Sequence, residues 1–255
     1  MDNLRRRKRL FEGSNLKNLN FLEIGPLDRP IVTREMVIVS YVDHLDTSGL
    51  RKKYAADPVV NAAEIVGIDF VWEGSLIEAV VNQASFDGVV ASHLIEHVPD
   101  LVTFLQEVDL LTTDSGELFL VIPDKNYTFD YLRHLSTITE VLANYIDKVK
   151  RPTSIQILDD FLNSSDWKIE DGWSKKRNKR VPKLSHGIDK VMNIATTVLK
   201  NQEYFDVHTW VFSPESFIGL IDKLRELELI NWKIKKIIPT SKLEFEFYCV
   251  LEKVN

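Results

Sequence analysis

The feature that most constrains the fold of this sequence is a strand, a helix and a second strand in close succession near its middle. Residues 87–92 and 117–122 are short apolar runs typical of buried strands. Between them, Pro99-Asp100 marks a helix start and Gly116 interrupts the chain before the second strand. The helical stripe consists of Leu101, Phe104, Leu105, Val108 and Leu111. Two strands joined by a crossover helix pair in parallel, so the unit predicts a mainly parallel sheet with helices on both faces.

Further patterns extend this unit into an α/β fold. Strands are predicted at residues 19–24, 36–42, 65–72, 232–238 and 244–253, and a last helix begins at Ser213-Pro214. The final two strands are separated by a short turn region, so they are expected to form an antiparallel hairpin at the sheet edge. Residues 1–18 are expected to be a basic tail, and residues of about 127–205 a polar, helical insertion or cap within a domain that spans 19–255.

Composition agrees with one domain of a reducing compartment. The chain has 255 residues, of which 44% are hydrophobic, enough for a sizeable core. Its apolar runs are too short for a signal peptide or a membrane helix. The single cysteine, Cys249, excludes an internal disulfide and lies in an apolar run. A cytoplasmic location is therefore expected.

Charge is concentrated in two basic segments on an otherwise acidic chain. Residues 5–9 carry five positive charges and residues 175–183 carry six, against 38 acidic residues in the whole chain. We expect a solvated tail and a solvated loop, with peripheral membrane contact through the tail, or contact of the loop with a phosphorylated acceptor, as alternatives. With a pI near 5.6 and no interleaved aromatic residues, nucleic-acid binding is not expected.

Polar residues at the predicted strand ends indicate a ligand site. His93, Glu96 and His97 follow the strand at 87–92, and ligands of open α/β sheets collect outside the carboxyl ends of the strands. Gly25 directly follows the first strand, where it permits a sharp turn and close approach of a ligand. Asp43 ends the second strand 18 residues later, near the spacing at which a carboxylate accepts ribose hydroxyl groups. This arrangement favours an adenosine-containing ligand.

These residues resemble motifs of the class I S-adenosylmethionine-dependent methyltransferases, in particular the type 11 group. Leu22-Glu23-Ile24-Gly25-Pro26 is similar to the first motif, Tyr41-Val42-Asp43-His44 to the acidic end of the second strand, and residues 86–97 to the fourth motif. The terminal hairpin is similar to the family's antiparallel last strand. The resemblance implies a Rossmann-like methyltransferase domain that binds S-adenosylmethionine. It also implies transfer of the methyl group to an oxygen of a sugar, a glycan or a related small molecule.

The resemblance also implies roles for particular residues. Asp43 would hold the ribose, Glu23 would order the loop at the methionine end, and Glu73 or Ser75 would lie near the adenine. The full expected cofactor set is Glu23, Gly25, Pro26, Arg29, Asp43, Glu73, Ser75, Ser92 and His93.

The first motif departs from the family pattern. Gly25 is followed by Pro26-Leu27-Asp28-Arg29-Pro30, and two prolines leave room for little more than a turn before the second strand. Without a helix dipole at that point, Arg29 would pair with the ligand carboxylate. A surface ion pair of Arg29 is an equal alternative.

The methyl donor is already activated, so the protein mainly has to align the acceptor and remove its proton. His97, Asp124 and His208 are the candidate general bases. Asp206 would orient His208 if that segment is extended.

Three other functions fit parts of the same pattern. His93-x-x-Glu96-His97 matches the inverted zinc-peptidase signature, although Pro99 leaves little room for the helix that such a hydrolase needs. A nicotinamide-dependent oxidoreductase would suit Gly25 and Asp43, but Leu27 stands in the place of its second glycine. A non-catalytic binding protein with the methyltransferase fold is the third alternative.

Overall fold

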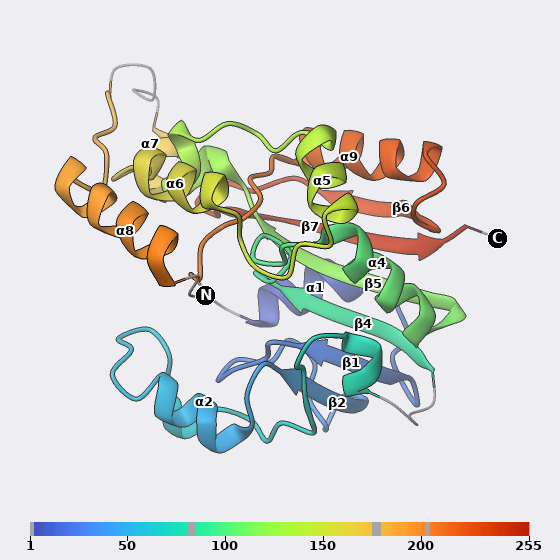
Figure 1. The fold of residues 1–255 in the computed structure, drawn as a ribbon. Helices are drawn as coiled ribbons and strands as arrows, with labels where there is room; N and C mark the ends of the chain where they lie inside the picture. The colour runs from blue at the N-terminus through green and yellow to red at the C-terminus, as the bar shows by residue number, and fades with distance from the viewer. Residues whose placement is uncertain (1–2, 81–84, 175–179, 202–204, 255) are drawn as a thin grey trace.

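The computed structural model describes residues 3–80, 85–174, 180–201 and 205–254, and its centre is a seven-stranded sheet (Figure 1). The strands are β1 (Asn20–Ile24), β2 (Ile38–Asp43), β3 (Phe70–Val71), β4 (Phe86–Ser92), β5 (Thr112–Pro123), β6 (Trp232–Ile238) and β7 (Glu246–Lys253). Their order is β3-β2-β1-β4-β5-β7-β6, and β7 is antiparallel to both of its neighbours. The predicted mainly parallel sheet with an antiparallel terminal hairpin is confirmed.

The order of the strands places a switch point between β1 and β4. From β1 the chain moves to β2 and β3 on one side, and it then returns to β4 and β5 on the other. Loops that leave the carboxyl ends of β1 and β4 therefore diverge, which is where ligands of open α/β sheets bind.

Helices cover both faces of the sheet. On one face, α3 (Leu76–Ala79), α4 (Leu101–Leu111) and α9 (Pro214–Glu226) contribute to the larger apolar core. Both long helices begin as the sequence predicts, because Asp100 accepts a hydrogen bond from the Thr103 amide and Ser213 caps the helix that starts at Pro214. On the other face, Leu10 and Phe11 of α1 (Asn3–Phe11) join a second core.

The remaining helices are α2 (Thr47–Lys53), α5 (Ile138–Ile146), α6 (Ser154–Asn163), α7 (Ile169–Trp173) and α8 (Ile188–Asn201), with short 3-10 helices at Ala62–Glu64, Lys125–Tyr127 and Phe129–Leu132. Among them, α5 packs against α4 and α9, and its Val141 belongs to the larger core. The others lie around the carboxyl ends of the parallel strands (Figure 1). Within the described part of residues 127–205 the chain is helical and holds no named strand. In Figure 1, α6, α7 and α8 gather at the left, beside the ends of these strands.

Two segments before β2 and β3 have less regular structure than is usual in an alternating α/β fold. Residues 25–37 are all described and hold no helix, as the two prolines predict. The predicted strand at 65–72 shrinks to Phe70–Val71, because the Val66 amide donates to the Leu27 carbonyl in the loop after β1. This segment therefore supports that loop before it joins the sheet.

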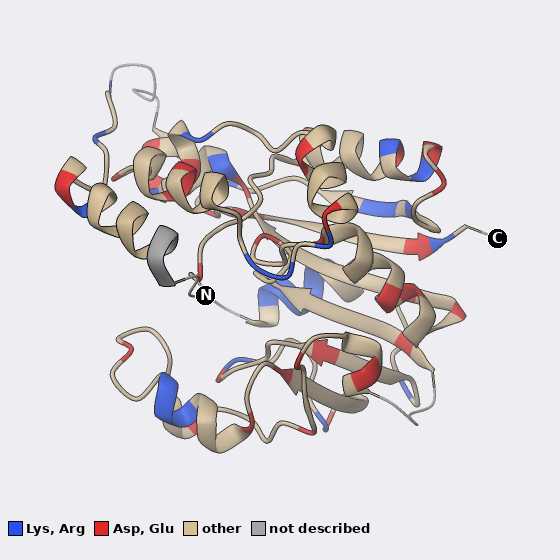
Figure 2. Ribbon diagram, viewed as in Figure 1, with Lys and Arg blue, Asp and Glu red and all other residues tan. Residues whose placement is uncertain are grey.

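The basic segment at residues 5–9 is a packed helix, which corrects the expectation of a solvated tail. Arg6 forms an ion pair with Glu246 at 2.6 Å, and Arg5 and Arg9 both pair with the buried Glu244. Figure 2 shows the basic residues of α1 beside the strands. Arg6 and Arg9 are thus paired with buried glutamates, while Arg5 and Lys8 stay exposed, so membrane contact through this segment stays a prediction.

The second basic segment is described only from residue 180 onward, so most of the expected solvated loop lies outside the described residues. Arg180 forms ion pairs with Asp166 and Asp171 and lies over the Trp167 ring. Among the described residues, no helix is long and apolar enough to cross a bilayer.

Candidate functional site

The loop after β1 is shaped by a glycine in the left-handed region and by a buried glutamate. Gly25 has a φ of +68°, and its amide donates to the Val42 carbonyl. The Glu23 carboxylate accepts hydrogen bonds from the amides of Ile31 at 2.6 Å and Val32 at 2.9 Å. Burial raises the pKa of Glu23 to about 8, against the lowering effect of those two bonds. Glu23 thus fixes the far end of the loop, while Gly25 fixes its start.

Pro26 and Arg29 lie in this loop in different surroundings. Pro26 is buried directly after Gly25. Arg29 forms an ion pair with Asp28 at 3.2 Å, and it donates to the Val59 carbonyl on an exposed part of the surface. Of the two roles considered for Arg29, the structure shows the surface ion pair.

Asp43 ends β2 with one carboxylate oxygen engaged and the other free. Its Oδ1 accepts from the His44 amide and lies 2.6 Å from His44 Nδ1. Its Oδ2 is buried and has no hydrogen-bond partner among the described residues. Buried polar atoms are almost always hydrogen-bonded, so an exception at a strand end of an α/β sheet points to a missing ligand group.

An open hollow of about 450 Å³ lies on the same side of the sheet. It is lined by Leu45 and Asp46, which closely follow Asp43, and by Val71 and Glu73 at the end of β3. Glu73, one of the two residues predicted near the adenine, therefore lines this hollow. The other, Ser75, caps α3 with its hydroxyl, which also donates to Glu107.

The fourth motif ends β4 with a tight turn. Ser92 pairs with Val121 of β5, and His93 has a φ of +49°, a conformation that few residues other than glycine adopt. Residues 93–97 form turns and bends rather than a helix, so the helix of an inverted zinc-peptidase site is absent from this fully described segment.

His93 is a member of a buried ion-pair cluster rather than a metal ligand or a free wall residue. Its Nε2 lies 2.7 Å from Glu246 Oε2, and its Nδ1 lies 3.5 Å from Glu96 Oε1. Burial alone would lower the pKa of His93, but Glu246 and Glu96 raise it to about 9. Both ring nitrogens of His93 face carboxylates, and the ligand-type side chains that gather with Glu96 and His97 do not include it, so the set His93, Glu96 and His97 is not the site that the motif suggests.

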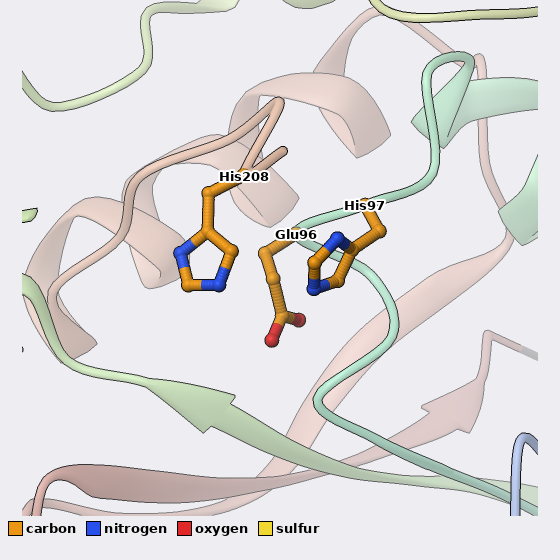
Figure 3. A group of neighbouring side chains, drawn as sticks. All are labelled: Glu96, His97 and His208. Atoms are coloured by element: carbon orange, nitrogen blue, oxygen red, sulfur yellow. The ribbon is translucent and has the colours of Figure 1, made fainter. Parts of the chain in front are cut away.

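Glu96 and His97 instead meet His208, which the chain brings from just before α9. Ligand atoms of these three side chains all lie within 4.8 Å of one another, and the two imidazole rings are 4.9 Å apart (Figure 3). Glu96 is fully buried, and neither of its oxygens has a hydrogen-bond partner among the described residues. Burial would raise the pKa of Glu96, but the imidazoles of His93, His208 and His97 outweigh it and lower the pKa.

Each of these two histidines has a carboxylate at its Nδ1. His97 Nδ1 lies 2.9 Å from Asp206, and His208 Nδ1 lies 2.7 Å from Asp130. The predicted pairing of Asp206 with His208 is therefore wrong: Asp206 holds His97 instead. His208 is held by a residue of the 3-10 helix after β5, for which neighbouring positions in the sequence give no signal.

Asp124, the third candidate base, accepts hydrogen bonds at both of its carboxylate oxygens. Its Oδ1 accepts from the Asn126 amide and side chain, and its Oδ2 accepts from the Thr240 hydroxyl at 2.8 Å. Burial raises its pKa. These contacts join β5 to the loop before β7, so the structure gives Asp124 a structural task.

Glu246, Arg6 and Asp130 belong to the site region but are not predicted from the sequence. Glu246 is completely buried at the start of β7 and accepts from Arg6, His93 and Tyr248. The available signal was an acidic residue inside an apolar strand, since such a residue needs buried partners. Those partners lie 153 and 240 positions away, beyond any local pattern.

No protein-family description and no curated protein matches this chain. Solved structures do match it. The CcbJ methyltransferase from Streptomyces caelestis aligns with a TM-score of 0.50 at 10% identity, covering 100% of this chain and 97% of its own. A putative Zn-dependent alcohol dehydrogenase from Rhodobacter sphaeroides aligns with a TM-score of 0.50 at 13% identity, covering 98% and 90%. The likeness shows a shared fold.

A third structure, the CurJ carbon methyltransferase, aligns with a TM-score of 0.47 at 10% identity over 100% of this chain. This chain spans about half of its length, 54%. The predicted α/β fold, a mainly parallel sheet with an antiparallel terminal hairpin, is confirmed by the order and directions of the strands, and the type 11 group stays a prediction.

Proposed function

We propose that this protein is an S-adenosylmethionine-dependent methyltransferase whose cofactor is held across the carboxyl ends of β1, β2 and β4. The observation that carries the proposal is the free, buried Oδ2 of Asp43. A ribose hydroxyl would donate to it and remove the cost of leaving a buried carboxylate oxygen unpaired. The shared fold with a methyltransferase supports the proposal.

Other residues of the same edge fit the remaining parts of the cofactor. The turn at Gly25 leaves the backbone open, because a side chain there would meet nothing closer than Leu94 at 3.9 Å. Glu73 and the hollow beside it offer a place for the adenine. Pro26 and Ser92 would form the walls of the cleft.

The bound cofactor would supply an activated methyl group, and the protein would supply alignment and a proton acceptor. His97 and His208 are the residues that we propose for the proton, because both imidazoles lie beside the carboxylate of Glu96. For the acceptor we propose an oxygen of a sugar, a glycan or a related small molecule, as the motif resemblance implies.

Calorimetry with S-adenosylhomocysteine tests the cofactor proposal. We expect one site per chain, and an affinity about 10-fold or more weaker for Asp43→Asn, which loses the charge-assisted hydrogen bonds to the ribose. Asp87→Asn is the matched control, because Asp87 accepts a hydrogen bond from the Asn20 amide at the amino ends of β1 and β4, away from the proposed cofactor site. Binding of NADH in place of S-adenosylhomocysteine would contradict the proposal and favour an oxidoreductase.

The acceptor needs a separate experiment. Mass spectrometry after incubation with S-adenosylmethionine and candidate sugar nucleotides, or cell extract, should show an acceptor that gains one methyl group. A protein that binds S-adenosylhomocysteine tightly but methylates nothing in such mixtures would be a binding protein with this fold.

A further inference from the structure

We infer that Glu96, His97 and His208 bind a divalent transition-metal ion at the carboxyl end of β4. The inference begins with Glu96, a glutamate with 0% of its surface exposed and no hydrogen-bond partner for either oxygen among the described residues. Its closest cationic group is His93 Nδ1, at 3.5 Å, and that ring donates its better hydrogen bond to Glu246. A buried carboxylate in this condition lacks a partner that a cation would provide.

The two histidines are oriented as metal ligands are. Asp206 lies 2.9 Å from Nδ1 of His97, as an ion-pair contact without hydrogen-bond geometry, and Asp130 is hydrogen-bonded to Nδ1 of His208 at 2.7 Å. A carboxylate at one ring nitrogen fixes the tautomer and leaves the other nitrogen as the ligand, which is the usual outer shell of a metal-binding histidine. In Figure 3 both rings turn the nitrogen farther from the backbone toward the Glu96 carboxylate.

The carboxylate of Asp130, which orients His208, is itself fixed by an ion pair. Asp130 is buried and pairs with Arg133 at 2.8 Å, and Arg133 also donates to the His208 carbonyl at 2.7 Å. Arg133 has 1% of its side chain exposed and pairs further with Asp159 and Asp160 of α6. His208 is thus fixed by both its ring and its backbone, as a preorganised ligand requires.

Two nitrogens and one carboxylate suit zinc, iron or manganese better than magnesium, which prefers oxygen ligands. Ligand atoms around a zinc ion lie about 3.4 Å apart at bond lengths near 2.1 Å, so the three side chains would have to close from their present separation of up to 4.8 Å. Three protein ligands leave at least one open position. The metal site itself does not rest on the proposed function. Its use in catalysis, to hold an oxygen of the acceptor, does rest on it, and it would replace the proton-acceptor role proposed above for His97 and His208, because both rings would then be ligands.

Zinc titration of the EDTA-dialysed full chain tests the inference. Calorimetry with ZnCl₂ should show one site per chain, and thermal unfolding should show a higher Tm with zinc. Asp206→Asn should weaken binding by about 10-fold to 100-fold, because it releases the His97 ring. Glu96→Gln and His208→Ala, which remove ligands, should weaken it more. His134→Ala is the control, because His134 is exposed and lies outside the cluster.

Cobalt provides a signature that a merely structural role for these residues would not give. Co²⁺ bound to the wild type should show visible absorption bands that His208→Ala changes, while circular dichroism confirms that each variant is folded. The exposed Asp206 keeps the test decisive if Glu96→Gln does not fold.

The inference is overturned if the wild type binds no zinc, or if folded Glu96→Gln and His208→Ala bind it as tightly as the wild type. These outcomes are independent of S-adenosylhomocysteine calorimetry. Loss of the metal site would therefore leave the proposed methyltransferase function untouched, and the reverse also holds.

Discussion

Two buried glutamates at the carboxyl ends of the parallel strands differ in the hydrogen bonds that they accept. Glu246 accepts four bonds, two from Arg6, one from His93 and one from the Tyr248 hydroxyl. Glu96 has neither oxygen hydrogen-bonded among the described residues, although it is equally buried. The Glu246 carboxylate has all its hydrogen-bond donors within the chain, so its role is structural. The Glu96 carboxylate and Oδ2 of Asp43 have no donor among the described residues. The difference separates structural charges from those that we assign to binding.

The largest expected effect is the loss of stability on substitution of Glu246, the glutamate that accepts four hydrogen bonds. Glu246→Gln leaves Arg6 and His93 buried without their negative partner, so the free energy of unfolding should fall by about 3 kcal/mol in urea denaturation. Glu252→Gln on the same strand is the control. Its ion pairs with Lys233 and Lys235 are partly exposed, and such pairs contribute at most about 1 kcal/mol. Equal losses for the two variants would contradict the distinction.

The free energy of unfolding at acid pH should depend on the ion pairs of Glu246. Burial would raise the pKa of Glu246, but bonds from His93 and Arg6 lower it to about 2. A carboxyl with a lowered pKa stabilises the fold above its ordinary value near 4.5 and loses this contribution as the pH falls toward 2. Unfolding curves should therefore show the difference between wild type and Glu246→Gln shrinking between pH 5 and about 2.5. A difference that stays constant over this range would exclude the ion pair as its source.

The unsatisfied glutamate should behave differently in metal-free protein. Glu96→Gln keeps the shape and removes a buried charge that accepts no hydrogen bond, while it loses the 3.5 Å attraction to His93. Because the imidazoles around Glu96 outweigh its burial and lower its pKa, we expect a loss of unfolding free energy, but one of only about 1 kcal/mol, smaller than that of Glu246→Gln. A loss as large as that of Glu246→Gln would show that Glu96 is structural.

The smallest effects are expected for Ser75 and Arg29, two predicted cofactor residues whose side chains contact other parts of the protein in the structure. Ser75→Ala should cost about 1 kcal/mol of stability as a lost helix cap. Arg29→Ala should change stability by less than about 0.5 kcal/mol, because its ion pair is exposed. Neither should alter the affinity for S-adenosylhomocysteine more than about twofold, and a 10-fold loss for Arg29→Ala would restore its predicted contact with the ligand.

The sequence predicts the sheet well because strands and helices are local patterns. The motif at residues 86–97, the missing first helix and the start of α9 at Pro214 all follow from neighbouring residues. The two clusters depend on contacts between distant positions: Arg6 reaches Glu246, and Asp130 reaches His208. Periodicity and spacing do not encode such contacts, so the sequence predicts a cleft residue at His93 and a solvated tail where α1 packs.

The most direct test of the central claim is calorimetric titration of the full chain with S-adenosylhomocysteine. The account predicts one site in the wild type and in Asp87→Asn, and an affinity about 10-fold or more weaker in Asp43→Asn. No binding to the wild type, or equal binding to all three proteins, would contradict the claim that the free oxygen of Asp43 marks the cofactor site.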